Sequence, residues 1–228
     1  MTSVVQHESL AHDHTSGRDP DRSSARPAAP TEPIADPGAW AILAFSATSL
    51  MLGLYNGNFV NPAGAALVIP VAFFFGGTIQ ILVAVLEVVR GNVFGAVVFG
   101  SFGPFWVIYG FIQTTFEEKV VAAATKANAD PVAAVSSGLT VFLAMFAVLT
   151  FVFLISALRT DVVLVSVLAL LLVALVLLMI GVRGGSEGFV HASGYVTVVF
   201  AVLGLYRGAA DVMTATYGRP VLPVFKLA

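Results

Sequence analysis

The chain has 228 residues, of which 58% are apolar and only 11% are charged. Soluble globular proteins carry about 25% charged residues, so this chain cannot cover itself with a surface that water solvates well. Its formal net charge of −2, with no basic stripe, excludes binding of nucleic acid by electrostatic attraction. The absence of cysteine excludes disulfides, thiolate metal sites and cysteine nucleophiles. The composition indicates an integral membrane protein.

Residues 1–37 differ in composition from the rest of the chain. They contain nine of the 24 charged residues, five of the 11 prolines and three of the four histidines. Such a segment cannot bury enough apolar surface to offset the entropy lost on ordering, so we predict a disordered cytoplasmic tail. It has no apolar h-region and is not a secretory signal peptide. His12 and His14 fit a solvated tail better than a metal site, and no metal or cofactor is predicted.

Six apolar stretches follow the tail. Each is long enough to cross a hydrocarbon core of about 30 Å, which takes roughly 20 helical residues. None shows the period-two alternation of β-barrel strands. The sequence therefore predicts an all-α fold, an integral membrane bundle of six transmembrane helices over residues 38–228, with 116–135 as the longest polar connection. The six predicted spans are 39–58, 63–89, 93–115, 136–158, 161–182 and 189–213.

The distribution of basic residues predicts the orientation of this bundle. An even number of spans places both termini on one side of the membrane. Lys and Arg residues near the spans are more frequent on that side, five against three. This excess predicts a multi-pass protein of the cell membrane with both termini in the cytoplasm. The five are Arg26, Arg90, Arg159, Arg219 and Lys226, and the three are Lys119, Lys126 and Arg183.

The second span carries small and polar residues on one helical face. A polar side chain inside a membrane costs free energy unless it finds a partner or lines a cavity. We predict that Gln80 lines a polar path and that the neighbouring glycines allow close helix packing. Glu87 lies near the end of the span that is predicted to face the cytoplasm. A structural role and a functional role are equally compatible with a carboxylate at this position. The face consists of Phe73, Gly76, Gly77, Gln80, Ala84 and Glu87.

Three other spans contain polar residues. The first carries Thr48 and Ser49 and ends in a neutral polar cluster that includes Asn56. Ser101 lies close to Pro104 in the third span, where the proline indicates either a packing kink or an interrupted helix of the kind found at transport sites. In the sixth, Arg207 and Asp211 are spaced for an ion pair within one helix.

Five segments, in order along residues 36–228, resemble the acetate uptake transporter family, whose bacterial type is the succinate–acetate permease. The resemblance implies a six-helix protomer, a homo-hexamer in the lipid bilayer, and a path through each protomer for acetate or possibly succinate. The segments are 74–81 (FFGGTIQI), 86–87 followed by 91–95, 101–106, 191–195 and 218–223.

The resemblance also implies site residues. The apolar constriction of the family, formed by Phe, Tyr and Leu, corresponds to Phe45, Phe102 and Leu171, so the tyrosine hydroxyl is missing here. The family motif Asn-Pro-Ala-Pro-Leu-Gly-Leu is replaced by residues 36–42, with only its first proline kept. On either side of the constriction, neutral groups are expected to replace the water lost by the substrate: Thr48, Ser49, Gln80, Ser101 and Asn56.

The function predicted first is transport of a small carboxylate, through a channel or a proton-coupled permease. An inside-negative potential opposes anion entry by about 2.3 kcal/mol per 100 mV, and Glu87 is the candidate for proton coupling. The alternative is a membrane sensor or scaffold that binds a ligand or a partner through the N-terminal tail. An intramembrane enzyme that uses Glu87, His191 or Asp211 is disfavoured, since these residues lie near opposite boundaries and cannot readily converge.

Overall fold

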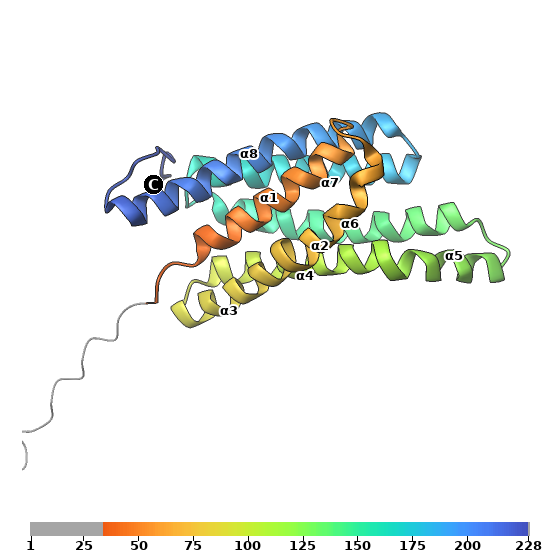
Figure 1. Ribbon diagram of the computed structural model, residues 1–228, viewed down its shortest axis with the longest axis horizontal. Coiled ribbons are helices and arrows are strands. Elements are labelled where there is room, and N and C mark those ends of the chain that lie inside the picture. Colours follow the sequence, from red (N-terminus) through yellow and green to blue (C-terminus); the bar gives the residue numbers. More distant parts are fainter. Residues whose placement is uncertain (1–33, 228) are drawn as a thin grey trace, which may run out of the picture. The chain divides into compact units, whose positions relative to one another are not determined.

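The computed structural model describes residues 34–227, and Figure 1 shows their helices. The predicted disorder of the tail and the two tail histidines therefore lie outside the described residues, apart from positions 34–37. Most of the described chain is helical, and its one extended pairing is a single bridge between Asp161 and Lys226. The elements are α1 (Gly38–Asn56), η2 (Pro62–Leu67), α2 (Val68–Val71), η3 (Ala72–Ile79), α3 (Gln80–Arg90), α4 (Val93–Phe111), η4 (Ile112–Phe116), α5 (Glu117–Lys126), α6 (Pro131–Ala157), α7 (Val162–Gly184) and α8 (Glu187–Tyr217).

Six helical rods are long and apolar enough to cross a membrane, as the sequence predicted. Their lengths differ from the prediction mainly in the third, which continues without a break from Val93 to Lys126. The polar connection predicted over 116–135 is therefore mostly helical, and half of it is helix α5, whose alanines and charged residues are good helix formers. The rods are Gly38–Asn56, Pro62–Arg90, Val93–Lys126, Pro131–Ala157, Val162–Gly184 and Glu187–Tyr217.

Side-chain caps set several helix ends. Asn92 begins α4 by accepting a hydrogen bond from the Gly95 amide at 3.1 Å. Asp161 begins α7 in the same way, with the Leu164 amide at 2.9 Å. Gly91 ends α3 with a φ of 74°, a left-handed conformation that glycine adopts without a steric penalty. These local signals fix where the rods turn back through the membrane.

Helix α8 packs along both α1 and α7, while α6 packs along α7 (Figure 1). The second rod packs along α4. Glycines make the contact between α1 and α8 close: a Cβ atom on Gly194 would overlap the backbone of Gly57, and one on Gly204 would overlap the Ser46 hydroxyl. Such a contact brings the two helices together at the level of their backbones.

The predicted polar face of the second rod is buried. Gly76, Gly77, Gln80, Ala84 and Glu87 are all shielded, whereas lipid-side residues such as Val85 are exposed. Directly before Gln80 lies the π-helical segment η3, which follows Pro70 by two residues. Segments of π-helix are rare and occur often at functional sites.

The helices begin and end at two opposite ends of the bundle, called the terminal end and the opposite end. The terminal end carries Gly38, Arg90, Asp161 and Tyr217, and the opposite end carries Asn56 and Gly185. At the terminal end, the segment after α8 folds back onto the connection between α6 and α7. The Val162 amide donates to the Phe225 carbonyl at 3.0 Å, and the Leu227 amide donates to the Thr160 carbonyl at 2.9 Å.

Candidate functional site

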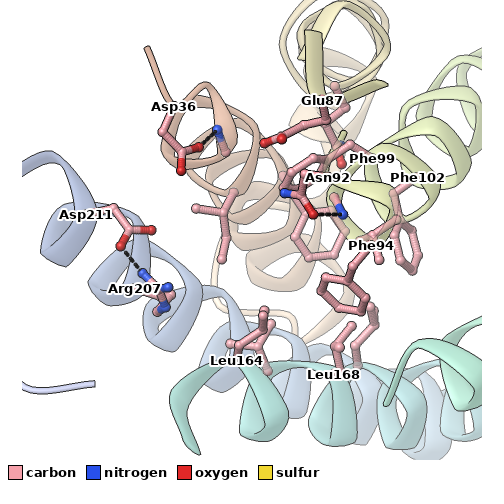
Figure 2. Close-up of a pocket in the computed structure, with 18 residues that line it drawn as sticks. Asp36, Glu87, Asn92, Phe94, Phe99, Phe102, Leu164, Leu168, Arg207 and Asp211 are labelled. Carbon is pink, nitrogen blue, oxygen red and sulfur yellow. Dashed lines mark hydrogen bonds and ion pairs between the residues drawn. The ribbon is translucent and has the colours of Figure 1, made fainter. Parts of the chain in front are cut away.

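Three cavities follow one another from the terminal end of the bundle to the opposite end. The terminal-side cavity has a volume of about 170 Å³ and lies between α1, α3, α4, α7 and α8. Charged side chains face it from two sides, with apolar side chains between them (Figure 2). The charged lining consists of Asp36, Glu87, Arg207 and Asp211, and the apolar lining includes Phe94, Phe99, Leu164 and Leu168.

The central cavity is smaller, at about 50 Å³, and mostly apolar. Its polar groups are supplied by Ser49, Asn56 and Thr197, and Trp106 and Leu175 are among its apolar residues. The opposite-side cavity is wide, at about 640 Å³, and its lining includes Asn56, Asn58 and His191. Because Asn56 lines both the central and the opposite-side cavity, these two spaces are neighbours at the end of α1.

Phe45, Phe102 and Leu171 line both the terminal-side and the central cavity. They come from α1, α4 and α7, so three separate rods contribute one residue each to the partition between the two spaces. All three are less than a tenth exposed, and the ring centroids of Phe45 and Phe102 lie 5.2 Å apart. We refer to these three residues as the apolar partition.

More aromatic rings support this partition. The ring of Phe200 stacks on Phe45 with centroids 6.0 Å apart, and Trp106 meets Phe45 edge-on at 6.5 Å. Phe102 also contacts Phe146 and Phe153 of α6. Aromatic pairs in such tilted and edge-on arrangements stabilise a core beyond the area that they bury.

The structure brings three of the predicted substrate-binding residues to the cavities. Gln80 lines the terminal-side cavity, where its Nε2 donates to the Gly76 carbonyl at 2.6 Å. Its Oε1 has no hydrogen-bond partner among the described residues. Ser49 and Asn56 line the central cavity on the other side of the apolar partition. Neutral polar groups therefore lie on both sides of the partition.

Thr48 and Ser101 lie elsewhere. Thr48 is buried, and its hydroxyl donates to the Ala44 carbonyl of its own helix at 2.8 Å. Its methyl group packs against Gly76, where a Cβ atom would come within 2.9 Å. Ser101 is half-buried and lines none of the three cavities formed by residues 34–227. Both residues adjoin a cavity-lining residue in sequence, but about 100° of helix rotation turns them away.

Glu87 lines the terminal-side cavity and lies at the junction of three helices. Its side chain is buried, and Oε2 forms an ion pair with Arg90 at 3.1 Å. Arg90 also pairs with Asp36, at 2.9 Å. A Cβ atom on Gly38 would lie 3.3 Å from Oε1, and one on Gly95 would lie 3.2 Å from Cδ. The carboxylate therefore packs against the first turns of α1 and α4, whose amino-terminal ends carry partial positive charge.

Arg207 lies on the other charged side of the same cavity (Figure 2). Its Nε donates to Asp161 Oδ2 at 2.8 Å, and one terminal nitrogen pairs with Asp211. The pair with Asp211 was predicted from the sequence spacing. Asp161 was not, because it is 46 positions away and its capping role alone does not show which arginine it meets.

Trp106 is a cavity residue that was not predicted to belong to the site. It is buried, lines the central cavity, and its indole Nε1 has no hydrogen-bond partner within residues 34–227. The sequence placed it in a segment of family resemblance but showed nothing of its direction. Its contact with Phe45 places it next to the apolar partition.

Comparison with known proteins agrees with this architecture. The model of the GPR1/FUN34/yaaH family matches residues 22–228. An uncharacterized protein of Methanothermobacter thermautotrophicus is 30% identical over 195 residues, which cover 85% of this chain and 92% of that protein. The succinate-acetate/proton symporter SatP of Escherichia coli is 27% identical over 191 residues, covering 84% and 95%. The solved structure of the bacterial acetate channel SatP superposes with a TM-score of 0.71 at 26% identity, covering 84% of this chain and 99% of that one.

Proposed function

Because the chain belongs to the GPR1/FUN34/yaaH family, we propose that it transports acetate or a similar small carboxylate across the cell membrane. The relatives named as a succinate-acetate/proton symporter and an acetate channel support this function. The observation that carries it is the order of the three cavities, with the apolar partition between the first two. The relatives with a functional name are a symporter and a channel, and we propose no enzymatic activity.

The partition sets the main energetic barrier on this path. An ionised carboxylate without partners loses much of its hydration free energy in an apolar environment, a cost of several kcal/mol or more. Gln80 on one side, with Ser49 and Asn56 on the other, offers hydrogen bonds immediately before and after the crossing. The neutral acid crosses at a lower cost, although a carboxylic acid with a pKa of about 4 is mostly ionised at pH 7.

Mutation of the partition tests the path. Labelled acetate uptake into proteoliposomes is measured for the wild-type protein and for Phe102→Ala. Removing this ring joins the two cavities, so we expect uptake of longer carboxylates such as butyrate to rise relative to acetate. Phe151→Ala is the matched control, because Phe151 is exposed on α6 and lines none of the three described cavities. Absence of acetate uptake by the wild-type protein rejects the proposed function.

Proton coupling is proposed to involve Glu87, whose burial beside the terminal-side cavity supports this role. Glu87→Gln keeps the shape of the side chain and removes its charge and its capacity to carry a proton. If Glu87 couples transport to protons, an imposed proton gradient accelerates uptake by the wild-type protein but not by the variant. Equal acceleration of both proteins makes Glu87 a structural residue.

We also propose that both termini face the cytoplasm and that the protein forms a homo-hexamer. Several rods expose apolar side chains on the outer surface, such as Phe74, Val141 and Phe151. Their exposure supports contact of this surface with lipid or with other protomers. Native mass spectrometry in detergent tests the assembly, and a mass other than that of six chains contradicts it.

The orientation is tested with the variant Arg219→Cys and a maleimide that does not cross the membrane. The introduced cysteine is the only site of labelling, because the natural sequence contains no cysteine.

A further inference from the structure

The terminal-side cavity has an uneven charge pattern. Three carboxylates line it, from Asp36, Glu87 and Asp211. Among the described residues that line this cavity, Arg207 is the one with a cationic side chain. A guanidinium group matches the two oxygens of a carboxylate in a bidentate geometry and stays charged at any physiological pH. Arg207 is therefore the lining residue best suited to receive an anionic carboxylate.

One edge of this guanidinium is fixed. Asp161, whose side chain is 5% exposed, accepts from Arg207 Nε at 2.8 Å. The same carboxylate caps α7 through the Leu164 amide, and its backbone lies under the folded-back C-terminal segment. An anchor with these three attachments positions Arg207 through Nε, and one of the terminal nitrogens pairs with Asp211 instead.

The other edge is paired with an exchangeable partner. Asp211 lies one helical turn after Arg207, and its side chain is 43% exposed, so water can solvate it when the pair opens. An ion pair with so exposed a member contributes about 0–1 kcal/mol, which a competing carboxylate can replace at little cost. Leu164 and Leu168 line the same cavity and offer an apolar surface for a short alkyl chain.

From this arrangement we propose that Arg207 receives the carboxylate of the substrate at the terminal end, and that Asp211 is an internal competitor for the same guanidinium. The inference rests on the proposed function. Substrate displaces Asp211 into water, and Asp211 returns to Arg207 when the substrate leaves. The negative charge that Asp36 and Glu87 place on the facing wall, only partly offset by Arg90, weakens binding further. Weak binding is required for rapid release from a transport path.

The two members of the pair are predicted to change affinity in opposite directions. Arg207→Gln removes the guanidinium group that binds the carboxylate. We expect the half-saturating acetate concentration for uptake into proteoliposomes to rise about tenfold, which corresponds to the loss of a charge-assisted hydrogen bond. Asp211→Asn removes the competitor's charge, and we expect the same concentration to fall severalfold. Arg207→Lys keeps the charge and is expected to lie between the wild type and Arg207→Gln. Arg159→Gln is the control, since Arg159 is an exposed arginine near the terminal end that does not line the described cavity.

These outcomes separate the inference from the function on which it rests. If wild-type protein takes up acetate but Asp211→Asn leaves affinity unchanged or weakens it, the pair is only structural and the inference is overturned. If Arg207→Gln fails to fold, as shown by gel filtration in detergent, the direction of the Asp211→Asn effect alone decides. If the wild-type protein takes up no acetate, the proposed function itself is rejected.

Discussion

The two ends of the bundle hold helix α1 in place by different means. At the terminal end, Asp36 precedes α1 and pairs with Arg90, while the buried Glu87 packs against the first turn of the helix. At the opposite end, the last turn of α1 contacts α8 through glycine: a Cβ atom on Gly194 would overlap the Gly57 backbone. One end uses charged side chains around a cavity, and the other uses direct backbone contact.

This difference affects how each end can move. The exposed ion pair of Asp36 with Arg90 forms and breaks at a small cost, and the long Arg90 side chain can follow small shifts of a helix. Backbone contact between glycines allows no such adjustment, because close-packed interiors resist even small changes of volume. The contrast predicts an adjustable terminal end and a fixed opposite end. Three substitutions test it, with effects that decrease from the glycine contact to the outer ion pair.

Gly194→Ala is expected to have the largest effect. Its Cβ atom would meet backbone atoms of Gly57 and Asn56, so α1 and α8 must separate. We expect a loss of about 3 kcal/mol or more, at the upper end of the overpacking range, and little folded protein after extraction. The measurement is gel filtration and thermal unfolding in detergent. Gly188→Ala is the matched control on the same helix, because its Cβ atom would meet no described heavy atom closer than 3.9 Å. Equal stability of both variants contradicts the glycine contact.

Glu87→Gln is expected to have an intermediate effect at the charged end. It removes the ion pair with Arg90 and the negative charge at the starts of α1 and α4, but the protein still folds. Loss of charge-assisted hydrogen bonding at a buried group costs about 2 kcal/mol, so the thermal midpoint should fall by several degrees. Glu118→Gln, on an exposed surface of α5, is the control. A loss as large as that of Gly194→Ala would mean that the terminal end is no more adjustable than the opposite end.

Asp36→Asn is expected to have the smallest effect. The amide oxygen can still accept from the Gly38 amide, and only the attraction to Arg90 is lost. Because the Asp36 side chain is 71% exposed, the pair contributes about 0.5 kcal/mol, and the difference from wild type should disappear at about 1 M NaCl. Thermal unfolding at low and high salt checks this. A difference that persists at high salt would show that Asp36 acts through something other than charge.

Several features were predictable from the sequence because they depend on local pattern. The six spans follow from lengths of apolar sequence, and the buried face with Gln80 and Glu87 follows from helical spacing. The Arg207–Asp211 pair follows from its separation of four residues. Phe45, Phe102 and Leu171 came from family resemblance, since nothing in an apolar residue alone shows that it borders a cavity.

Other features depend on contacts between distant segments, which spacing does not reveal. Asp161 meets Arg207 across 46 positions, and only the packing of α7 against α8 brings them together. Thr48 and Ser101 are polar residues beside cavity-lining neighbours, yet their rotation about the helix axis directs Thr48 to a packing contact and keeps Ser101 out of the described cavities. The continuation of the third rod through α5 depends on helix propensity beyond the apolar span.

The apolar partition has a consequence for the energy balance of a cell. Protons move rapidly along unbroken files of hydrogen-bonded water, and a narrow apolar constriction expels such a file. Phe45, Phe102 and Leu171 interrupt the row of cavities at the middle of the bundle. A membrane that contains many copies of this protein can therefore maintain its ion-motive force while it remains open to nutrient exchange.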